Sequence, residues 1–235
     1  MSTIKKKIYT NKAAHKVVGP IYGRIKRKRN FTSGSYWEGR YEKGGNSGAG
    51  SYGRLAVFKA DFLNDFVKKH KINQTIEFGV GDGAQLKLFT FPNYIGFDVS
   101  KASIDLCKNI FLKDKTKSFF LYNPDSFIDN HQIFKGELAL SLDVIYHLVE
   151  DTVFDKYMKD LFSCSAKYVI IYASDTDDNK DNYAQHVKHR KFSKWVAKNQ
   201  KNWRLEKVVK NKYSIETNEI DESFADFFIY KKIKS

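Results

Sequence analysis

Three glycines, Gly79, Gly81 and Gly83, alternate with other residues at the end of an apolar run. Glycine lacks a Cβ atom, so the backbone there can adopt positive φ and approach a ligand closely. Glu77 stands two residues before the first glycine, and Asp98 ends the next apolar run. A carboxylate at the end of the second strand of an α/β sheet can accept hydrogen bonds from both hydroxyls of a ribose. The spacing therefore indicates a site for a ligand that contains a nucleoside.

A histidine and an aspartate follow the fourth predicted strand, where a reacting group bound beside such a ligand would lie. A histidine ordinarily titrates near neutral pH, so His147 is a candidate to accept a proton from a hydroxyl group. Asp143, four residues earlier, is the second candidate catalytic residue. The alternatives are that His147 only packs over the ligand and that Asp143 only shapes the ligand pocket.

A basic segment late in the chain contains His186, His189 and Arg190, which could bind a phosphate or carboxylate on a substrate. The alternative is a solvated basic helix face. Asp143 together with Asp178 and Asn179 offers oxygen ligands of the kind that Mg²⁺ prefers. Residues 175–181 are more simply a solvated acidic loop, and we expect no metal.

A segment rich in glycine and tyrosine covers residues 31–52. Its aromatic and basic side chains, Tyr36, Trp37, Arg40 and Tyr41, could close over a bound ligand and exclude water from a reacting centre. Residues 31–52 are therefore predicted to form a flexible lid. The alternative is an aromatic cluster that packs on the edge of the sheet.

Strand and helix patterns alternate from residue 75 onward, and this alternation indicates βαβ units and a parallel sheet covered on both faces. Apolar residues at helical spacing predict a helix over 54–70, and Ser100 can cap a helix over 100–111. The other predicted helices cover 84–89, 151–166 and 182–199. The predicted strands cover 75–80, 94–99, 117–122, 137–145, 168–172, 203–210 and 224–232, the last two being antiparallel neighbours.

The charge of the chain is concentrated at its beginning. The 235 residues carry a net charge of +14, of which +10 falls within residues 1–30, where no acid occurs. We interpret 1–30 as a basic arm and 31–235 as a single domain. The arm is a solvated segment, a contact for an anionic substrate, or a grip on nucleic acid. No apolar run approaches the roughly 20 residues needed to span a bilayer, so the sequence predicts a cytoplasmic protein.

The glycine stretch 75–84 and the stretch 94–100 resemble motifs I and II of the class I methyltransferases that depend on S-adenosylmethionine (SAM). The resemblance covers about residues 36–232 and implies a Rossmann-like, seven-stranded, mostly parallel sheet with its last strand antiparallel. It implies that Glu77 and the glycine backbone contact the methionine part of SAM and that Asp98 contacts the ribose. Further cofactor contacts are expected from Val99, Asp125, Ser126 and Leu142, with Asn123 and Phe127 as additional candidates near the adenine.

Gly79, Gly81 and Ala84 also satisfy the looser dinucleotide-binding fingerprint, which remains an alternative. The third glycine, the acid before the first one, and the lack of a following substrate domain favour the methyltransferase interpretation.

A second resemblance concerns the acceptor. Residues 35–53 and 186–195 are similar to segments of bacterial methyltransferases associated with surface glycans and capsules. This resemblance implies O-methylation of a small molecule or a surface-polysaccharide precursor, on a sugar hydroxyl or a phosphate-type group. Two alternatives stay open: an RNA methyltransferase that uses the basic arm, and a SAM-binding module without catalysis.

Overall fold

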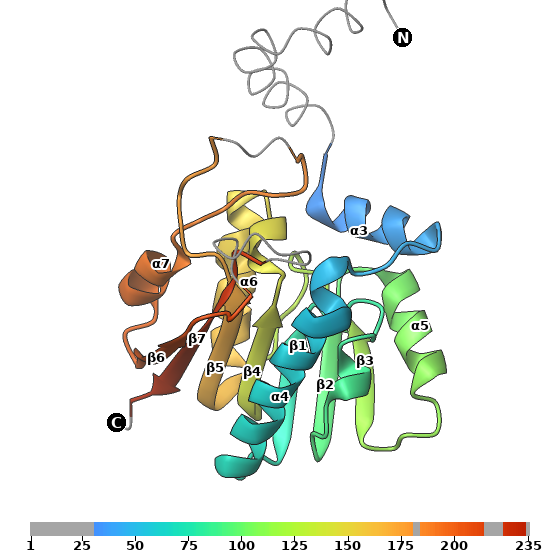
Figure 1. Ribbon diagram of the computed structural model, residues 1–235, viewed down its shortest axis with the longest axis horizontal. Coiled ribbons are helices and arrows are strands. Elements are labelled where there is room, and N and C mark those ends of the chain that lie inside the picture. The colour runs from blue at the N-terminus through green and yellow to red at the C-terminus, as the bar shows by residue number, and fades with distance from the viewer. Residues whose placement is uncertain (1–30, 181–183, 214–222, 234–235) are drawn as a thin grey trace, which may run out of the picture.

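The computed structural model describes residues 31–180, 184–213 and 223–233, so the basic arm predicted at 1–30 lies outside the described residues. One seven-stranded sheet, in the order β3-β2-β1-β4-β5-β7-β6, forms the centre of this part of the chain (Figure 1). The strands are β1 (Gln74–Phe78), β2 (Asn93–Asp98), β3 (Lys117–Leu121), β4 (Gly136–Leu142), β5 (Ser165–Ala173), β6 (Trp203–Val209) and β7 (Asp226–Lys232).

The strand directions confirm the predicted fold class. Strands β1 to β5 run parallel to one another. β7 is inserted between β5 and β6 and runs antiparallel to both. The sheet is therefore Rossmann-like and mostly parallel, with its last strand antiparallel.

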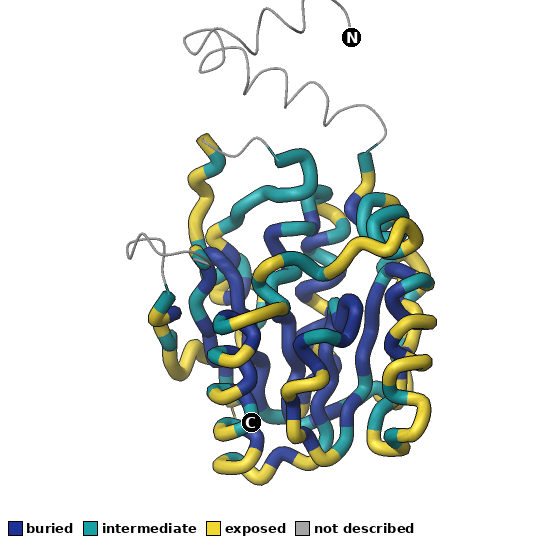
Figure 2. Tube along the Cα trace, turned by 45° about the vertical axis from the view of Figure 1, so that its right-hand side comes forward, coloured by how far each residue is buried: buried dark blue, intermediate teal, exposed yellow. Residues whose placement is uncertain are grey.

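Successive strand residues point to opposite sides of the sheet, so apolar strands have two apolar faces. Helices cover both of these faces. Ile76 and Phe78 of β1 face a core shared with α6 (Asp151–Ser163) and α7 (Phe192–Asn199). Leu138 and Leu140 of β4 face the opposite core, shared with α4 (Gly53–Lys69) and α5 (Lys101–Ile110). Figure 2 shows the buried strands enclosed by helices whose outward residues are exposed. In the described residues, no helix combines the length and the apolar character needed to cross a bilayer.

The helix predicted over 84–89 is absent, and the one predicted over 182–199 is shorter than predicted. After Gly83 the chain forms only the 3-10 turn η2 (Leu86–Leu88), and no helix continues toward Pro92, which disfavours helical backbone at Phe91. The helix predicted over 182–199 begins only at Phe192, and residues 181–183 lie outside the description. The backbone amides of Lys188 and His189 bond instead to Tyr146 O and Asn179 Oδ1.

The segment predicted to be a flexible lid contains a helix. Residues 31–52 form α3 (Ser33–Glu42) and the short η1 (Ala49–Ser51). The side chain of Thr32 caps α3 by accepting from Ser35 N, just as Ser100 caps α5 by accepting from Ser103 N. In Figure 1, α3 lies across the end of the sheet at which the parallel strands finish.

Candidate functional site

A cavity of about 520 Å³ lies at the carboxyl ends of β1 to β4, beneath α3. Ligands of open α/β sheets bind at this edge, and the strand order reverses here because β2 and β4 flank β1. Across the sheet, the lining passes from residues after β3, through those after β2 and β1, to those after β4. The lining includes Ser33, Trp37, Tyr41, Ser47, Ser51, Lys59, Glu77, Gly79, Gly81, Gln85, Asp98, Val99, Leu121, Asn123, Asp125, Leu142, Asp143, His147, Glu150 and Tyr157.

The three glycines have different roles. All three adopt positive φ, at 90° for Gly79, 60° for Gly81 and 75° for Gly83. Gly79 and Gly81 line the cavity, and a Cβ on Gly81 would lie 2.3 Å from Ser47 Oγ. Gly83 lies outside the cavity; a Cβ there would lie 3.1 Å from Cys107 Sγ, so this glycine lets the loop pack against α5.

Glu77 and Asp98 both reach the cavity from buried positions. Glu77 Oε2 accepts a hydrogen bond from Tyr94 Oη at 2.7 Å, and burial raises the pKa of Glu77 to about 7. Asp98 Oδ2 accepts from Gly81 N at 2.9 Å and Oδ1 accepts from Ser100 N at 2.9 Å. Burial raises the pKa of Asp98 to about 6 although these bonds oppose the increase. Two desolvated carboxyl groups therefore face one cavity, where a cation would stabilise their charged forms.

The end of the cavity farthest from β4 is formed by residues at the end of β3 and just after it. Leu121, Asn123 and Asp125 line it, together with Val99 after β2 and Leu142 at the end of β4. Asn123 Oδ1 accepts from Asp125 N at 3.0 Å and holds this turn in place. The structure separates the remaining candidates from the cavity. Ser126 does not line it, and Phe127 packs in the core with its ring centroid 5.6 Å from that of Phe97.

Asp143 is held by an ion pair to the buried Lys59, which was not among the predicted site residues. It adopts a φ of 60°, rare for a residue with a Cβ atom. Its Oδ2 lies 2.6 Å from Lys59 Nζ, and its Oδ1 accepts from Tyr146 Oη at 2.9 Å. Lys59 is only 1% exposed. Its position among the buried apolar residues Leu55, Leu63 and Val67 of α4, at helical spacing, was the available signal. Asp143 thus fixes the turn after β4.

His147 lines the cavity from η3 (Ile145–His147) and is neutral there. Burial lowers its pKa to about 4. Its Nδ1 lies 2.8 Å from His186 O, and a carbonyl oxygen can only accept, so Nδ1 carries the proton and Nε2 keeps its lone pair. The Trp37 ring packs edge-on against His147 at 4.9 Å, and the His186 ring stacks on it at 5.3 Å. A neutral imidazole with an available lone pair is the form that can accept a proton.

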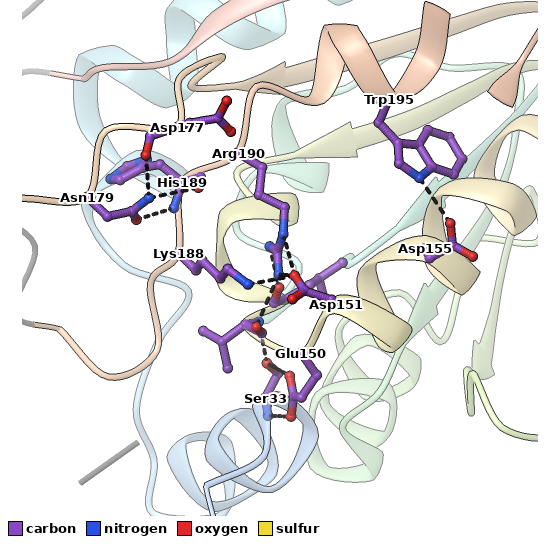
Figure 3. Close-up of polar contacts among 12 residues, drawn as sticks. Ser33, Glu150, Asp151, Asp155, Asp177, Asn179, Lys188, His189, Arg190 and Trp195 are labelled. Carbon is purple, nitrogen blue, oxygen red and sulfur yellow. Dashed lines mark hydrogen bonds and ion pairs between the residues drawn. The ribbon is translucent and has the colours of Figure 1, made fainter. Parts of the chain in front are cut away.

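Two of the three predicted substrate residues, His186 and Arg190, contact the segment 147–149, and Figure 3 shows Arg190 directed at Asp151. Arg190 donates from Nη1 to Leu148 O at 2.6 Å and from Nη2 to Val149 O at 3.1 Å, and its Nη2 pairs with Asp151 Oδ1 at 2.8 Å. His189 Nδ1 lies 2.6 Å from Ser174 Oγ. None of His186, His189 and Arg190 lines the cavity.

Residues 31–52, which the sequence predicts to be a lid, are held beside the cavity by hydrogen bonds near both of their ends. Asp82 Oδ2 accepts from Ser47 N at 2.8 Å and from Tyr52 Oη at 2.6 Å. At the start of α3, Ser33 Oγ donates to Glu150 Oε2 at 2.5 Å, as Figure 3 shows. Asp82 and Glu150 were not among the predicted site residues.

The four residues predicted to close over a ligand fall into two groups. Trp37 and Tyr41 line the cavity. Tyr36 and Arg40 do not, because the Tyr36 ring stacks on His186 at 4.4 Å and Arg40 Nε donates to Asn46 O at 2.5 Å. Tyr36 thereby joins α3 to the loop that carries His186.

The acidic loop does not join Asp143. Asp178 Oδ1 accepts from Lys180 N, and Asn179 Nδ2 donates to His189 O, so both side chains organise their own loop. Within the described residues, no three His, Cys, Asp or Glu side chains gather in an arrangement that could hold a metal ion.

No family model and no curated protein matches this chain. Solved structures do match, with low identity. The methyltransferase domain of bacterial-CtHen1-C is 17% identical, with a TM-score of 0.60 over 75% of this chain and 97% of that chain. N-methyltransferase NodS from Bradyrhizobium japonicum WM9, in complex with S-adenosyl-L-homocysteine (SAH), is 11% identical, with a TM-score of 0.60 over 77% and 88%. Magnesium protoporphyrin IX methyltransferase from Synechocystis PCC 6803, with bound SAH, is 11% identical, with a TM-score of 0.57 over 76% and 84%. The chain therefore has the fold of these methyltransferases.

Proposed function

We propose that this protein is a SAM-dependent methyltransferase. The observation that carries the proposal is the charge of the cavity. Among the described residues that line it, Glu77, Asp98, Asp125, Asp143 and Glu150 are acids, and Lys59 is the single lysine or arginine. Because Lys59 is paired with Asp143, the cavity favours a ligand that carries positive charge.

The residues present fit SAM, whose sulfonium supplies the methyl group when the cofactor is bound. Asp98, after the second strand, is placed to accept from ribose hydroxyls. Gly79 and Gly81 allow the ligand to approach the backbone, and Glu77 offers negative charge on the same side. Asn123 and Asp125 lie two strands away from Glu77, beyond Asp98, where the base of the nucleoside would bind.

The same features oppose a dinucleotide. A pyrophosphate is normally bound at the N-terminus of the helix that follows the glycines, through free amides and the helix dipole. Here only the 3-10 turn η2 follows the glycines, and the amide of Gly81 already donates to Asp98. An anionic ligand would also meet the carboxylates of this cavity.

His147 is the residue proposed to remove a proton from the acceptor. Its Nδ1 is fixed as a donor by His186 O, which leaves Nε2 to act as the base; burial, which lowers the pKa of His147 to about 4, keeps the ring neutral but weakens it as a base. Asp143, engaged by Lys59 and Tyr146, is proposed to position the segment that carries His147. His186 and Arg190 are proposed to orient this segment, since their contacts are to it.

A histidine base suits a hydroxyl acceptor, which must lose its proton during methylation. We therefore propose O-methylation of a small molecule or surface-polysaccharide precursor in the cytoplasm, in keeping with the similarity of residues 35–53 and 186–195 to glycan-associated methyltransferases. RNA is the second candidate. Ten basic residues within 1–30 favour it, and two structural neighbours are named bacterial CtHen1 and small RNA methyltransferase HEN1, the latter 15% identical with a TM-score of 0.57.

Calorimetric titration with SAM, SAH and NAD tests the cofactor. We expect micromolar binding of SAM and SAH, none of NAD, and at least a tenfold loss for Asp98→Ala. Asp105→Ala, an exposed acid on α5, is the matched control and should bind normally. Binding of NAD without SAM would refute the proposal.

Transfer of labelled methyl groups from SAM then tests the acceptor. Sugar nucleotides, anionic glycans and RNA are offered in parallel to the wild type and to a chain lacking residues 1–30. Labelling of RNA that depends on those residues would favour the second candidate.

A further inference from the structure

Four aromatic rings from three separate segments form a closed cycle of contacts around His147. Tyr36 stacks on His186 with a centroid distance of 4.4 Å and an interplanar angle of 8°. His186 stacks in turn on His147 at 5.3 Å and 20°. Trp37 closes the cycle, because its ring meets His147 edge-on at 4.9 Å and Tyr36 edge-on at 5.3 Å. Each ring of the cycle therefore packs against two of the others.

Two of these rings face the cavity and two do not. Trp37 and His147 line it, whereas Tyr36 and His186 are not part of the lining. The contact that Tyr36 makes is instead with the residue whose carbonyl group fixes His147. His186 O lies 2.8 Å from Nδ1 of His147 and accepts its proton, which leaves the lone pair on Nε2. The ring and the carbonyl group of His186 thus act on the same imidazole, one by stacking and the other by hydrogen bonding.

The position of the His186 carbonyl group depends on how its segment is held. One backbone bond ties the segment to η3, since Lys188 N donates to Tyr146 O at 2.7 Å. The stack on Tyr36 adds a contact to α3, which comes from a distant part of the chain. An aromatic pair of this kind contributes enough free energy to change a local equilibrium about two- to tenfold. Loss of the Tyr36 ring should therefore let the His186 segment move away from His147 more often.

We propose that Tyr36 is a positioning residue for the base His147. Its ring holds His186, and the carbonyl group of His186 keeps the His147 proton on Nδ1, so that Nε2 can take a proton from the acceptor. This role of Tyr36 rests on the proposed function and deepens it, because it makes the docking of α3 a condition for a working base. The helix that covers the cavity and the group that removes the proton are then parts of one arrangement.

Hydrogen exchange of the Nδ1 proton of His147 measures how often its bond to His186 opens. Nitrogen-15 NMR of the ligand-free protein follows this proton and, as an internal reference, the Nε1 proton of Trp195. The reference proton is donated to Asp155 at 3.0 Å, outside the cycle of rings. Tyr36→Ala should accelerate exchange at His147 about two- to tenfold and leave exchange at Trp195 unchanged.

Three further variants separate the stack from other effects. Tyr36→Phe keeps the ring and loses only the hydroxyl group, so His147 should exchange at the wild-type rate. Tyr213→Ala removes a tyrosine ring that packs edge-on against Phe58, outside the cycle, and should change neither proton. If Tyr36→Ala does not fold, His186→Ala removes the ring that Tyr36 holds but keeps the carbonyl group, and should give the same acceleration.

An exchange rate at His147 that Tyr36→Ala leaves unchanged, or that Tyr36→Phe raises equally, would overturn the inference. Equal acceleration at Trp195 would overturn it too, because it would show a general loosening of the fold. These measurements need no ligand, whereas calorimetry with SAM and SAH tests the proposed function. Failure of the wild type to bind either ligand would refute the proposed function, and the contact of Tyr36 would still be judged by its own result.

Discussion

The substitution Glu77→Gln separates stability from cofactor binding. Glu77 is buried in the cavity wall, and burial raises its pKa from 4.5 to about 7. A carboxyl group whose pKa is raised on folding contributes stability below pH 4.5 and loses that contribution as the pH rises through 7. At 1.36 kcal/mol for each pH unit between the two values, the ionised group costs the ligand-free protein about 3 kcal/mol at pH 8.

Glutamine has the same shape and keeps an oxygen that can accept from Tyr94 Oη. Glu77→Gln should therefore raise the free energy of unfolding by up to about 3 kcal/mol at pH 8. For a chain of this size, that corresponds to a rise of roughly 6–12 °C in Tm. The gain should be nearly lost at pH 4.5, where the wild-type carboxyl is protonated in the folded state and half protonated in the unfolded state. SAM affinity should fall at least tenfold, because the ligand's positive charge loses a carboxylate.

Thermal unfolding followed by circular dichroism between pH 4.5 and 8, with and without SAM, measures both effects. The exposed Glu42→Gln is the matched control and should shift Tm little at any pH. A Glu77→Gln protein that is less stable than the wild type at pH 8, or a Tm difference that does not change with pH, would contradict the assignment of a desolvated carboxyl group to this site.

Three further results are expected. Nitrogen-15 NMR of the histidine rings should show His147 neutral and protonated on Nδ1 from pH 5 to 8, since its pKa is lowered to about 4; titration near 6.5 would exclude the buried arrangement. Asp82→Asn weakens the acceptor for Ser47 N and Tyr52 Oη, so stopped-flow dissociation of SAM should accelerate severalfold; an unchanged rate would show that the lid is not fastened there. Arg190→Lys cannot reproduce the forked contacts of the guanidinium. Urea denaturation should therefore show that the free energy of unfolding falls by about 1–3 kcal/mol. Unaltered stability would show that these contacts contribute little.

The strands and the glycine loop were predictable because their signals are local. The alternation of apolar runs with turn residues gives all seven strands to within a few residues, and Ser100 marks the start of α5. Gly79, Gly81 and Asp98 meet at one cavity because consecutive parallel strands end at the same edge of the sheet.

The predictions that failed depend on contacts from distant parts of the chain. The basic residues before Phe192 have helical spacing, yet their amides bond to Tyr146 O and to the side chains of Asp177 and Asn179. The glycine-rich stretch before residue 45 seemed too flexible for a helix, but Glu150, more than one hundred residues later, binds the first turn of α3. Neither partner can be identified from the local pattern.

The position of β7 has a consequence for how the chain is made. β5 is completed at Ala173, but in the described part of the chain its outer edge is paired by β7, whose residues are 226–232. A growing chain therefore carries an unpaired, strongly apolar strand edge while all the residues between are being added. Such an edge can pair with other chains, so synthesis is the period in which this protein is most exposed to aggregation. Cells or expression hosts in which elongation slows between residues 173 and 226 should yield less folded protein. In the complete sheet this edge of β5 is covered by β7.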